Sequence, residues 1–234
     1  MDQLRPVTIE TGVNLYAEGS ALINMGDTRV LCTASWDDKP PPHKKGTGEG
    51  WVTAEYSMLP RATQTRTARE SRTGRVDGRT QEIQRLIGRA LRAAIDMPLM
   101  GERTIMVDCD VLQADGGTRT ASITGGFVAL HLALQKAVER NLLRVIPIRH
   151  FVSAVSVGIV QGQPRLDLNY LEDFAAQTDM NCVLAEDGRF IEIQATAEKD
   201  PFSAEQYAAL VGLVTNGMRT LFARQREALE RAKP

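Results

Sequence analysis

A pair of glycines followed by a threonine and an arginine lies where an apolar run gives way to a helical pattern. In the run Gly116-Gly117-Thr118-Arg119, the start of the helix offers unpaired N–H groups and a positive dipole end, which both attract anions. The glycines let the backbone approach an anion closely, and the arginine adds a rigid fork of donors. This pattern fits a phosphate site. The alternative is an ordinary helix start in which Thr118 or Ser122 is the cap and Arg119 points into solvent.

Arg79 opens another predicted helix, directly after Gly78. If the two helix starts face each other, Arg79 and Arg119 would converge on one anion, and backbone amides would complete the site. The alternative is an arginine on the protein surface, which is common in the first turn of a helix.

Four acidic residues surround a predicted junction between elements: Asp167, Glu172, Asp173 and Asp179. Hard divalent cations such as Mg²⁺ bind carboxylate oxygens and keep several waters, so one or two carboxylates suffice when a substrate supplies phosphates. This cluster predicts a divalent metal site. The alternative is a set of solvated carboxylates in turns.

Arginines gather in one segment of the chain although the net charge is only -1. Between positions 61 and 92, three acidic residues accompany nine arginines: Arg61, Arg66, Arg69, Arg72, Arg75, Arg79, Arg85, Arg89 and Arg92. A mobile basic loop can bind single-stranded RNA through the negative charge of the RNA backbone. The affinity of such binding falls steeply as the salt concentration rises. The segment therefore predicts RNA binding, and a solvated linker is the alternative.

The motifs of several other enzyme classes are absent from the sequence. It has no Gly-x-x-x-x-Gly-Lys-Ser/Thr phosphate loop, no Rossmann glycine fingerprint, no Gly-x-Ser-x-Gly elbow and no His-Glu-x-x-His. The three histidines have no metal-ligand spacing: His43, His131 and His150. The three cysteines lie far apart in apolar runs and are expected to be reduced core residues: Cys32, Cys109 and Cys182.

The composition, 43% apolar and 24% charged over 234 residues, predicts a folded protein rather than a disordered one. The longest uncharged apolar stretch, residues 151–160, is about half of the roughly 20 residues that a membrane span needs. The first residues lack the apolar core of a signal peptide. We therefore expect a cytoplasmic protein with no membrane partner.

Elements that could position these residues follow from periodicity. In the first half we expect a hairpin of residues 20–25 and 28–33 around Gly26-Asp27, and an exposed, mobile loop over 40–50 that could act as a lid. Residues 63–77 lack apolar periodicity and predict a solvated segment. A helix is expected from Gly78 until Pro98 ends it, then a strand over 104–112 and a helix over 118–139 with one apolar face.

The second half repeats this order of elements. Strands are expected over 152–160, 165–168, 180–185 and 190–194, and a helix from Ser203, whose hydroxyl would form a capping box with Gln206. We predict an α+β fold in which residues 1–234 form a single domain of two related halves, approximately 1–145 and 146–234.

Long motifs throughout the chain resemble those of the ribonuclease PH family, bacterial phosphorolytic 3′-to-5′ exoribonucleases. They include Leu4-Arg-Pro6 and the runs over residues 50–63, 78–91, 101–104, 108–125 and 179–181. Two positions depart from the family pattern. Asp77 stands where a small residue is common, and Gly125-Gly126 replaces the usual Gly-Ala, which would soften that helix.

The resemblance implies the ribonuclease PH-type fold, a ribosomal protein S5 domain 2-like sandwich of two βαβ-containing halves. It also implies roles for individual residues: phosphate binding by Arg79, Gly117, Thr118 and Arg119, metal binding by Asp173 and Asp179, and RNA binding by Arg66, Arg69 and Arg72. Arg79, Arg119, Asp173 and Asp179 would then be the catalytic residues.

The implied reaction trims 3′ extensions of tRNA precursors and of other structured RNAs, ribosomal RNA included. Inorganic phosphate is the co-substrate, Mg²⁺ or Mn²⁺ the metal, and nucleoside diphosphates the products; the reverse reaction, a tRNA nucleotidyltransferase activity, adds nucleotides. The implied assembly is a homo-oligomeric ring, a hexamer built as a trimer of dimers. Two other functions are open to the sequence: a catalytically silent ring subunit, and a two-metal hydrolytic nuclease that releases monophosphates.

Overall fold

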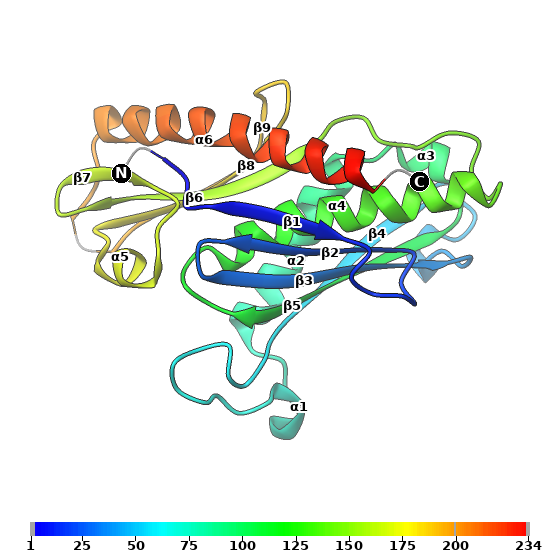
Figure 1. The fold of residues 1–234 in the computed structure, drawn as a ribbon, viewed down its shortest axis with the longest axis horizontal. Helices are drawn as coiled ribbons and strands as arrows, with labels where there is room; N and C mark the ends of the chain where they lie inside the picture. Colours follow the sequence, from blue (N-terminus) through cyan, green and yellow to red (C-terminus); the bar gives the residue numbers. More distant parts are fainter. Residues whose placement is uncertain (1–2, 199, 233–234) are drawn as a thin grey trace.

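The chain folds into two β-sheets with helices packed around and between them (Figure 1). A computed structural model describes residues 3–198 and 200–232. The first sheet has the order β1-β2-β3-β5-β4. Its strands are β1 (Val7–Thr11), β2 (Gly19–Met25), β3 (Thr28–Asp37), β4 (Trp51–Met58) and β5 (Thr104–Gln113). The second sheet has the order β7-β6-β8-β9. Its strands are β6 (Val152–Val160), β7 (Gln163–Leu166), β8 (Thr178–Ala185) and β9 (Phe190–Ala197).

The first sheet combines the predicted hairpin with a parallel crossover. Strands β2 and β3 pair antiparallel around Gly26, which adopts a φ of 56°. Strand β4 pairs parallel with β5, so the chain between them crosses over through α1 (Glu70–Thr73), α2 (Gly78–Ala93) and α3 (Met97–Met100). This unit is a βαβ motif. The predicted helix boundary was wrong, because α2 ends at Ala93 and Pro98 instead lies in the first turn of α3, where its missing N–H is not needed.

The second sheet is antiparallel throughout. Strands β7 and β8 both pair antiparallel with β6, so they run parallel to each other on either side of it. The chain between them forms α5 (Tyr170–Ala175), and the result is a split βαβ unit. Helix α5, which carries Asp173, leads directly into the start of β8, which carries Asp179.

Helix α4 (Thr118–Glu139) lies between the two sheets rather than on the outside of one. It packs against β2 and β3 on one side and against β6 on the other. The predicted apolar face is buried, Phe127 and Leu134 included. Other sides of the helix are buried as well, with Ala121 and Gly125 among their residues. Small residues let the helix fit closely between the two sheets. At Gly125, for example, a Cβ would lie only 2.7 Å from Ile23 Cγ2.

Helix α6 (Ala204–Arg231) closes the structure by covering β1, β6 and β7 (Figure 1). It begins as predicted, with a capping box between Ser203 and Gln206. Its apolar face is internal: Leu210, Val214 and Leu221 are fully buried. The side chain of Gln225 donates to the carbonyls of Thr124 and Val152 and so ties α6 to α4 and β6.

Two exposed segments leave the body of the first half. Residues 63–77, called the arm below, project away from the sheets and carry α1 (Figure 1). The loop over 40–50 contains a short 3₁₀ turn, η1 (Pro42–Lys44), and leads into the start of β4 at Trp51. The arm follows the other end of the same strand. The loop and the arm thus lie at opposite ends of β4. Within one chain, the loop therefore cannot act as a lid over the region where β4 ends and the arm begins.

The remaining sequence predictions about the body concern thiols and membranes. All three cysteines are free and buried, as expected. Throughout 3–198 and 200–232, the helices fall short of the combined length and hydropathy that crossing a bilayer requires.

Candidate active site

A cleft of about 400 Å³ lies where the start of α4 meets the second sheet, and its walls come from both halves of the chain. The first half contributes the residues around the ends of β4 and β5 and the starts of α2 and α4; the second half contributes α5, β6 and β8. All six residues predicted to bind phosphate or metal line this cleft: Arg79, Gly117, Thr118, Arg119, Asp173 and Asp179.

The start of α4 presents backbone to the cleft. Gly116 and Gly117 have φ values of 73° and 67°, in the left-handed region that glycine adopts at little cost. Gly117 is the N-cap, and no side chain caps the helix. The alternative in which Thr118 or Ser122 is the cap is therefore wrong. Thr118 Oγ1 instead bonds the Tyr56 hydroxyl at 2.8 Å, and Ser122 Oγ donates to the Thr118 carbonyl.

Arg119 connects the two halves across the cleft. Its side chain is only 15% exposed, so the alternative of a solvated arginine is also wrong. Nη1 lies 3.4 Å from Oε1 of Gln194 on β9 and 3.6 Å from Oε1 of Glu82 on α2. These contacts orient the guanidinium beside the open end of α4.

Arg79 is the second residue of α2 and is exposed, so it is free to reorient toward an incoming anion. Together with Arg119, it counteracts the desolvation that raises the pKa of Tyr56 and of Asp173. Both arginines also line the same cleft as Thr118 and Asp173. The two helix starts therefore converge on one cleft, as the sequence predicted.

The predicted acidic cluster separates into two groups. Asp167 is fully buried in an ion pair with Arg5, and Glu172 forms a capping box with Asn169 at the start of α5. Asp173 on α5 and Asp179 on β8 line the cleft. Of the four acidic residues around this junction, only the two predicted as metal ligands line the cleft, because Asp167 and Glu172 serve the local fold.

Both cleft carboxyls have a raised pKa. Desolvation is the main cause at Asp173, although the residue keeps much of its surface exposed, and Arg79 and Arg119 oppose it. At Asp179, desolvation and the negative charge of Asp173 raise the pKa, while Arg119 and a hydrogen bond from Asn181 lower it. The Asn181 amide lies 3.2 Å from Asp179 Oδ2. Because the charge of Asp173 disfavours ionisation of Asp179, a cation bound beside the two carboxyls would stabilise their charged forms.

The donor set fits an open metal site rather than a closed one. Within the described ranges, no three His, Cys, Asp or Glu side chains are grouped so as to hold an ion. Asp173 and Asp179 alone match a hard cation that takes its other ligands from water and substrate phosphates. The hydroxyl of Ser156, which also lines the cleft, is buried and lacks a hydrogen-bond partner in the described structure. An unpaired buried hydroxyl beside these carboxylates is suited to bonding such a ligand.

Among the residues that line the cleft, the sequence reasoning missed Ser156, Tyr170 and Asn181. It also missed Tyr56, which lies outside the cleft lining and bonds Thr118. Asn181 lies two residues after Asp179 on β8, so strand periodicity alone places both side chains on one face. Ser156 pairs with Asn181 across β6 and β8, a register that no local pattern reveals.

The arginine-rich segment does not act as one unit. Arg66, Arg69 and Arg72 are exposed on the arm, outside the cleft. Arg69 lines a neighbouring cleft of about 610 Å³ that shares Arg79 and Met58 with the first. In contrast, Arg89 forms an ion pair with Glu192, and Arg92 donates to the Val52 carbonyl and lies 4.4 Å over the Trp51 ring. The last part of the segment therefore supports the fold.

Comparison with known families assigns this arrangement. The model of the 3′ exoribonuclease family, domain 1, matches residues 3–136, and the model of domain 2 matches residues 150–213. The chain belongs to the 3′ exoribonuclease family. Its domain 1 supplies Arg79 and the 116–119 turn, and its domain 2 supplies Asp173 and Asp179.

Two bacterial relatives are similar over almost their whole length. A protein named Ribonuclease PH from Syntrophomonas wolfei is 56% identical over 97% of this chain and 95% of the relative. Another of the same name, from Methylobacterium radiotolerans, is 56% identical over 97% of this chain and 96% of the relative. The predicted activity, phosphorolytic 3′-to-5′ exoribonuclease, is confirmed by these relatives and by the family.

Solved structures confirm the fold. Rice Rrp46 aligns with a TM-score of 0.79 at 19% identity, covering 97% of this chain and 96% of that one. A chain of the Archaeoglobus fulgidus exosome with RNA bound to the active site aligns with a TM-score of 0.79 at 23% identity, covering 95% of this chain and 89% of that one. The ribonuclease PH-type α+β fold is thus the fold of this chain.

Proposed function

We propose that the 400 Å³ cleft binds inorganic phosphate between Arg79, Arg119 and the backbone amides of Gly117 and Thr118, and that this phosphate is the nucleophile. One observation carries the proposal: two helix starts, each with an arginine in its first turn, converge opposite two carboxylates. A helix N-terminus with nearby arginines favours a small oxyanion.

The reaction follows from that position. An oxygen of the bound phosphate attacks the phosphorus of the last phosphodiester bond of an RNA, and the bond from that phosphorus to the 3′ oxygen of the preceding nucleotide breaks. The products are a nucleoside diphosphate and an RNA one residue shorter with a free 3′ hydroxyl. No side chain acts as nucleophile, because the protein positions two anions and offsets their repulsion.

Asp173 and Asp179 would hold a divalent cation, Mg²⁺ or Mn²⁺, on the second-half side of the cleft. Such an ion, when bound, stabilises negative charge on the leaving 3′ oxygen. Asn181 orients the Asp179 carboxylate through its amide. The unpaired Ser156 hydroxyl is placed to bond a ligand that enters between these groups.

The substrate that we propose is the 3′ end of tRNA precursors and other structured RNAs. The exposed arginines of the arm, Arg66, Arg69 and Arg72, would hold the RNA backbone away from the cleft. Arg79 lines both the active cleft and the cleft beside the arm, so it lies where an RNA strand would pass between them.

We also propose that the chain acts as one domain with halves 1–145 and 146–234, and that copies of it assemble into a homohexameric ring, a trimer of dimers. Support comes from the solved neighbours, which include a chain named as part of the archaeal exosome core, aligned with a TM-score of 0.75. Measuring the mass of the purified protein in solution tests the size of the ring.

Product analysis tests the reaction. A tRNA with a short 3′ extension is incubated with and without inorganic phosphate, and the released nucleotide is identified. Nucleoside diphosphates that appear only with phosphate are expected. Monophosphates released without phosphate would point to a hydrolytic nuclease, and the absence of any release would point to a silent ring subunit.

The Arg119→Ala variant tests the site itself. It should lose phosphorolysis while keeping most RNA binding, because the variant retains the arm. Arg144→Ala, which removes an exposed arginine outside the cleft, is the matched control and should keep full activity. Phosphate-dependent release of nucleoside diphosphates by Arg119→Ala would overturn the assignment.

A further inference from the structure

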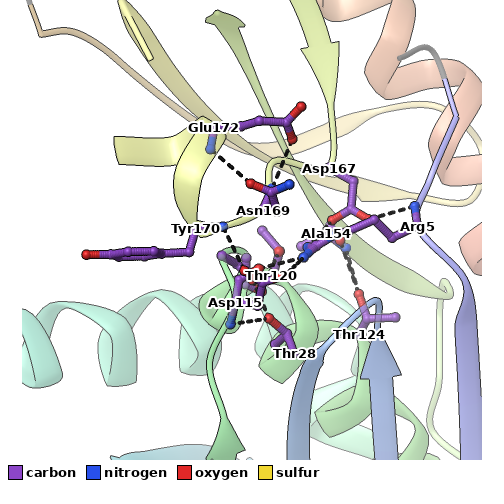
Figure 2. A network of polar contacts seen from close by, with 12 residues as sticks. Arg5, Thr28, Asp115, Thr120, Thr124, Ala154, Asp167, Asn169, Tyr170 and Glu172 are labelled. Carbon is purple, nitrogen blue, oxygen red and sulfur yellow. Dashed lines mark hydrogen bonds and ion pairs between the residues drawn. The ribbon is translucent and has the colours of Figure 1, made fainter. Parts of the chain in front are cut away.

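Arg5, in the Leu4-Arg-Pro6 motif, has no part in the chemistry proposed above, yet it binds residues from both halves of the chain (Figure 2). Its backbone N–H and Nε each lie 3.0 Å from Asp167 Oδ2, and its Nη2 lies 2.7 Å from Asp167 Oδ1. The Asp167 side chain is completely buried. Three donors from one residue therefore satisfy a carboxylate that water does not reach.

Asp167 is itself held in an unusual backbone conformation. Its φ is 56°, in the left-handed region that residues other than glycine seldom adopt, and its N–H donates to the Ser156 carbonyl at 2.7 Å. Such a residue persists only where its surroundings fix it. The ion pair with Arg5 supplies that fixation at the point where the chain leaves β7 for α5.

The same guanidinium also reaches the turn before α4. Nη1 of Arg5 donates to the Asp115 carbonyl at 2.5 Å and lies 3.5 Å from Asp115 Oδ2. Thr28 holds this turn from the other side, because its hydroxyl donates to the Gly116 carbonyl at 2.6 Å and accepts from the Asp115 N–H at 2.9 Å. The turn that presents backbone amides to the cleft is thus fixed on both sides.

Asp115 then connects the turn to α5. Its Oδ1 accepts a hydrogen bond of 3.1 Å from the backbone N–H of Tyr170, the first residue of α5 and three residues before Asp173 (Figure 2). Direct packing reinforces this contact: a Cβ on Gly116 would lie 2.3 Å from the Leu168 carbonyl oxygen. The phosphate side and the acidic side of the cleft therefore meet through Asp115.

We propose that Arg5, Asp115 and Asp167 are positioning residues that hold the phosphate-binding turn in register with Asp173 on α5. This set, called the Arg5 clamp, touches neither phosphate nor RNA. The inference rests on the proposed function of the cleft. Other contacts already join the two halves, among them the packing of α4 on both sheets and the Arg89–Glu192 ion pair. The clamp is therefore not needed merely to hold the halves together, and its distinct feature is its place at the edge of the cleft.

Variants at Asp115 can separate a positioning role from a role in folding. The side chain is 31% exposed, so replacing it does not leave a fully buried charge without its partner. Asp115→Ala removes the acceptor for the Tyr170 N–H, whereas Asp115→Asn keeps it. We expect Asp115→Ala to lower kcat on the order of tenfold to a hundredfold, as small misplacements of reacting groups do. Its affinity for inorganic phosphate, measured by calorimetry, and its KM for RNA should stay within about twofold. Asp115→Asn should restore most of kcat.

Arg5→Lys provides a second test that does not leave Asp167 without a cationic partner. A single ammonium group retains a charge for Asp167 but lacks the fork that reaches the Asp115 carbonyl at the same time. A loss of kcat comparable to that of Asp115→Ala is expected. The control is Arg149→Lys, which alters a surface ion pair with Asp96 and should leave kcat unchanged.

Wild-type kcat in both Asp115→Ala and Arg5→Lys, with both proteins folded by circular dichroism, would overturn the clamp. A loss of kcat in Asp115→Ala that Asp115→Asn does not restore would overturn it as well. Arg119→Ala is assayed beside them. If Arg119→Ala is inactive and the clamp variants are normal, only the clamp fails; if Arg119→Ala retains phosphorolysis, the proposed function fails.

Discussion

Charged side chains at the cleft balance one another before any substrate enters. Arg79 and Arg119 carry two positive charges, and Asp173 and Asp179 carry up to two negative ones, with raised pKa values that show the cost of keeping them ionised in this setting. A phosphate ion and an RNA phosphodiester both add negative charge. A divalent cation would offset that charge on the acidic side, while the arginines offset it on the other.

Removing the acidic charge should therefore separate phosphate binding from catalysis. The double variant Asp173→Asn with Asp179→Asn keeps the size of both side chains and removes two negative charges near the phosphate position. We expect phosphate affinity, measured by calorimetry, to be unchanged or higher, and phosphorolysis to fall by about a hundredfold or more. Substantial phosphorolysis in the double variant would contradict the role of the two carboxylates. Glu186→Gln, on the surface away from the cleft, is the control.

The cysteines should be chemically silent in the native protein. Burial raises the pKa of Cys182 to about 12, and Cys32 and Cys109 are also buried. Since the thiolate is the reactive form, a thiol reagent such as dithionitrobenzoate should label none of the three at neutral pH until denaturant is added. Rapid labelling of one thiol in the native protein would show that β3, β5 or β8 opens readily to solvent.

At the scale of elements, the two glycines in the middle of α4 have different surroundings. A Cβ on Gly126 would meet Val107 Cγ1 at 3.4 Å, an ordinary contact, whereas a Cβ on Gly125 would meet Ile23 Cγ2 at 2.7 Å. Gly126→Ala should raise the free energy of unfolding by about 0.5–1 kcal/mol through helix propensity. Gly125→Ala should lower it by about 1–3 kcal/mol through overpacking. Denaturant unfolding of both variants tests this, and equal effects would contradict the packing of α4.

The arm should bind RNA mainly through charge. Arg66→Ala with Arg69→Ala should weaken binding of tRNA and lower the slope of log affinity against log salt by roughly 0.7 to 0.9 for each RNA phosphate that is no longer neutralised. Arg144→Ala with Arg219→Ala removes the same charge from exposed positions away from the arm and should leave the slope unchanged. The affinities are measured over a range of salt concentrations. An unaltered slope in the arm variant would argue against this role.

Local patterns predicted some elements and not others, for physical reasons. The hairpin at Gly26-Asp27 and the capping box at Ser203 depend on neighbouring residues and were predicted. Strands β1 and β4 were missed, although alternate residues of β4, such as Val52 and Ala54, are buried. Helix α5 was missed because it is only six residues long and buries no apolar face.

The site shows the same division. The turn over residues 116–119 was predicted to belong to the site, and it lines the cleft, because its signal lies in consecutive residues. The separation of Asp167 from Asp173 was not, because it depends on Arg5, which is 162 positions away in the sequence. The pairing of Ser156 with Asn181 likewise depends on strand register in the second sheet. Long-range pairing of this kind leaves no local signal.

At the scale of the whole molecule, the shared position of α4 should make the two halves unfold together. One hydrophobic core includes residues of both sheets, such as Val107 and Val155. Trp36 and Trp51 report on the first half through their fluorescence, and Cys182 reports on the second through labelling in a variant with Cys32→Ala and Cys109→Ala. We expect the two probes to give one midpoint at a given protein concentration. Separate midpoints would contradict a single domain.

The most direct test of the phosphate site is a crystal structure of the protein grown or soaked with inorganic phosphate. An ion is expected between the guanidinium groups of Arg79 and Arg119, within hydrogen-bonding distance of the Gly117 and Thr118 amides. A structure in which these two arginines point away from each other with no ion between them would contradict the account.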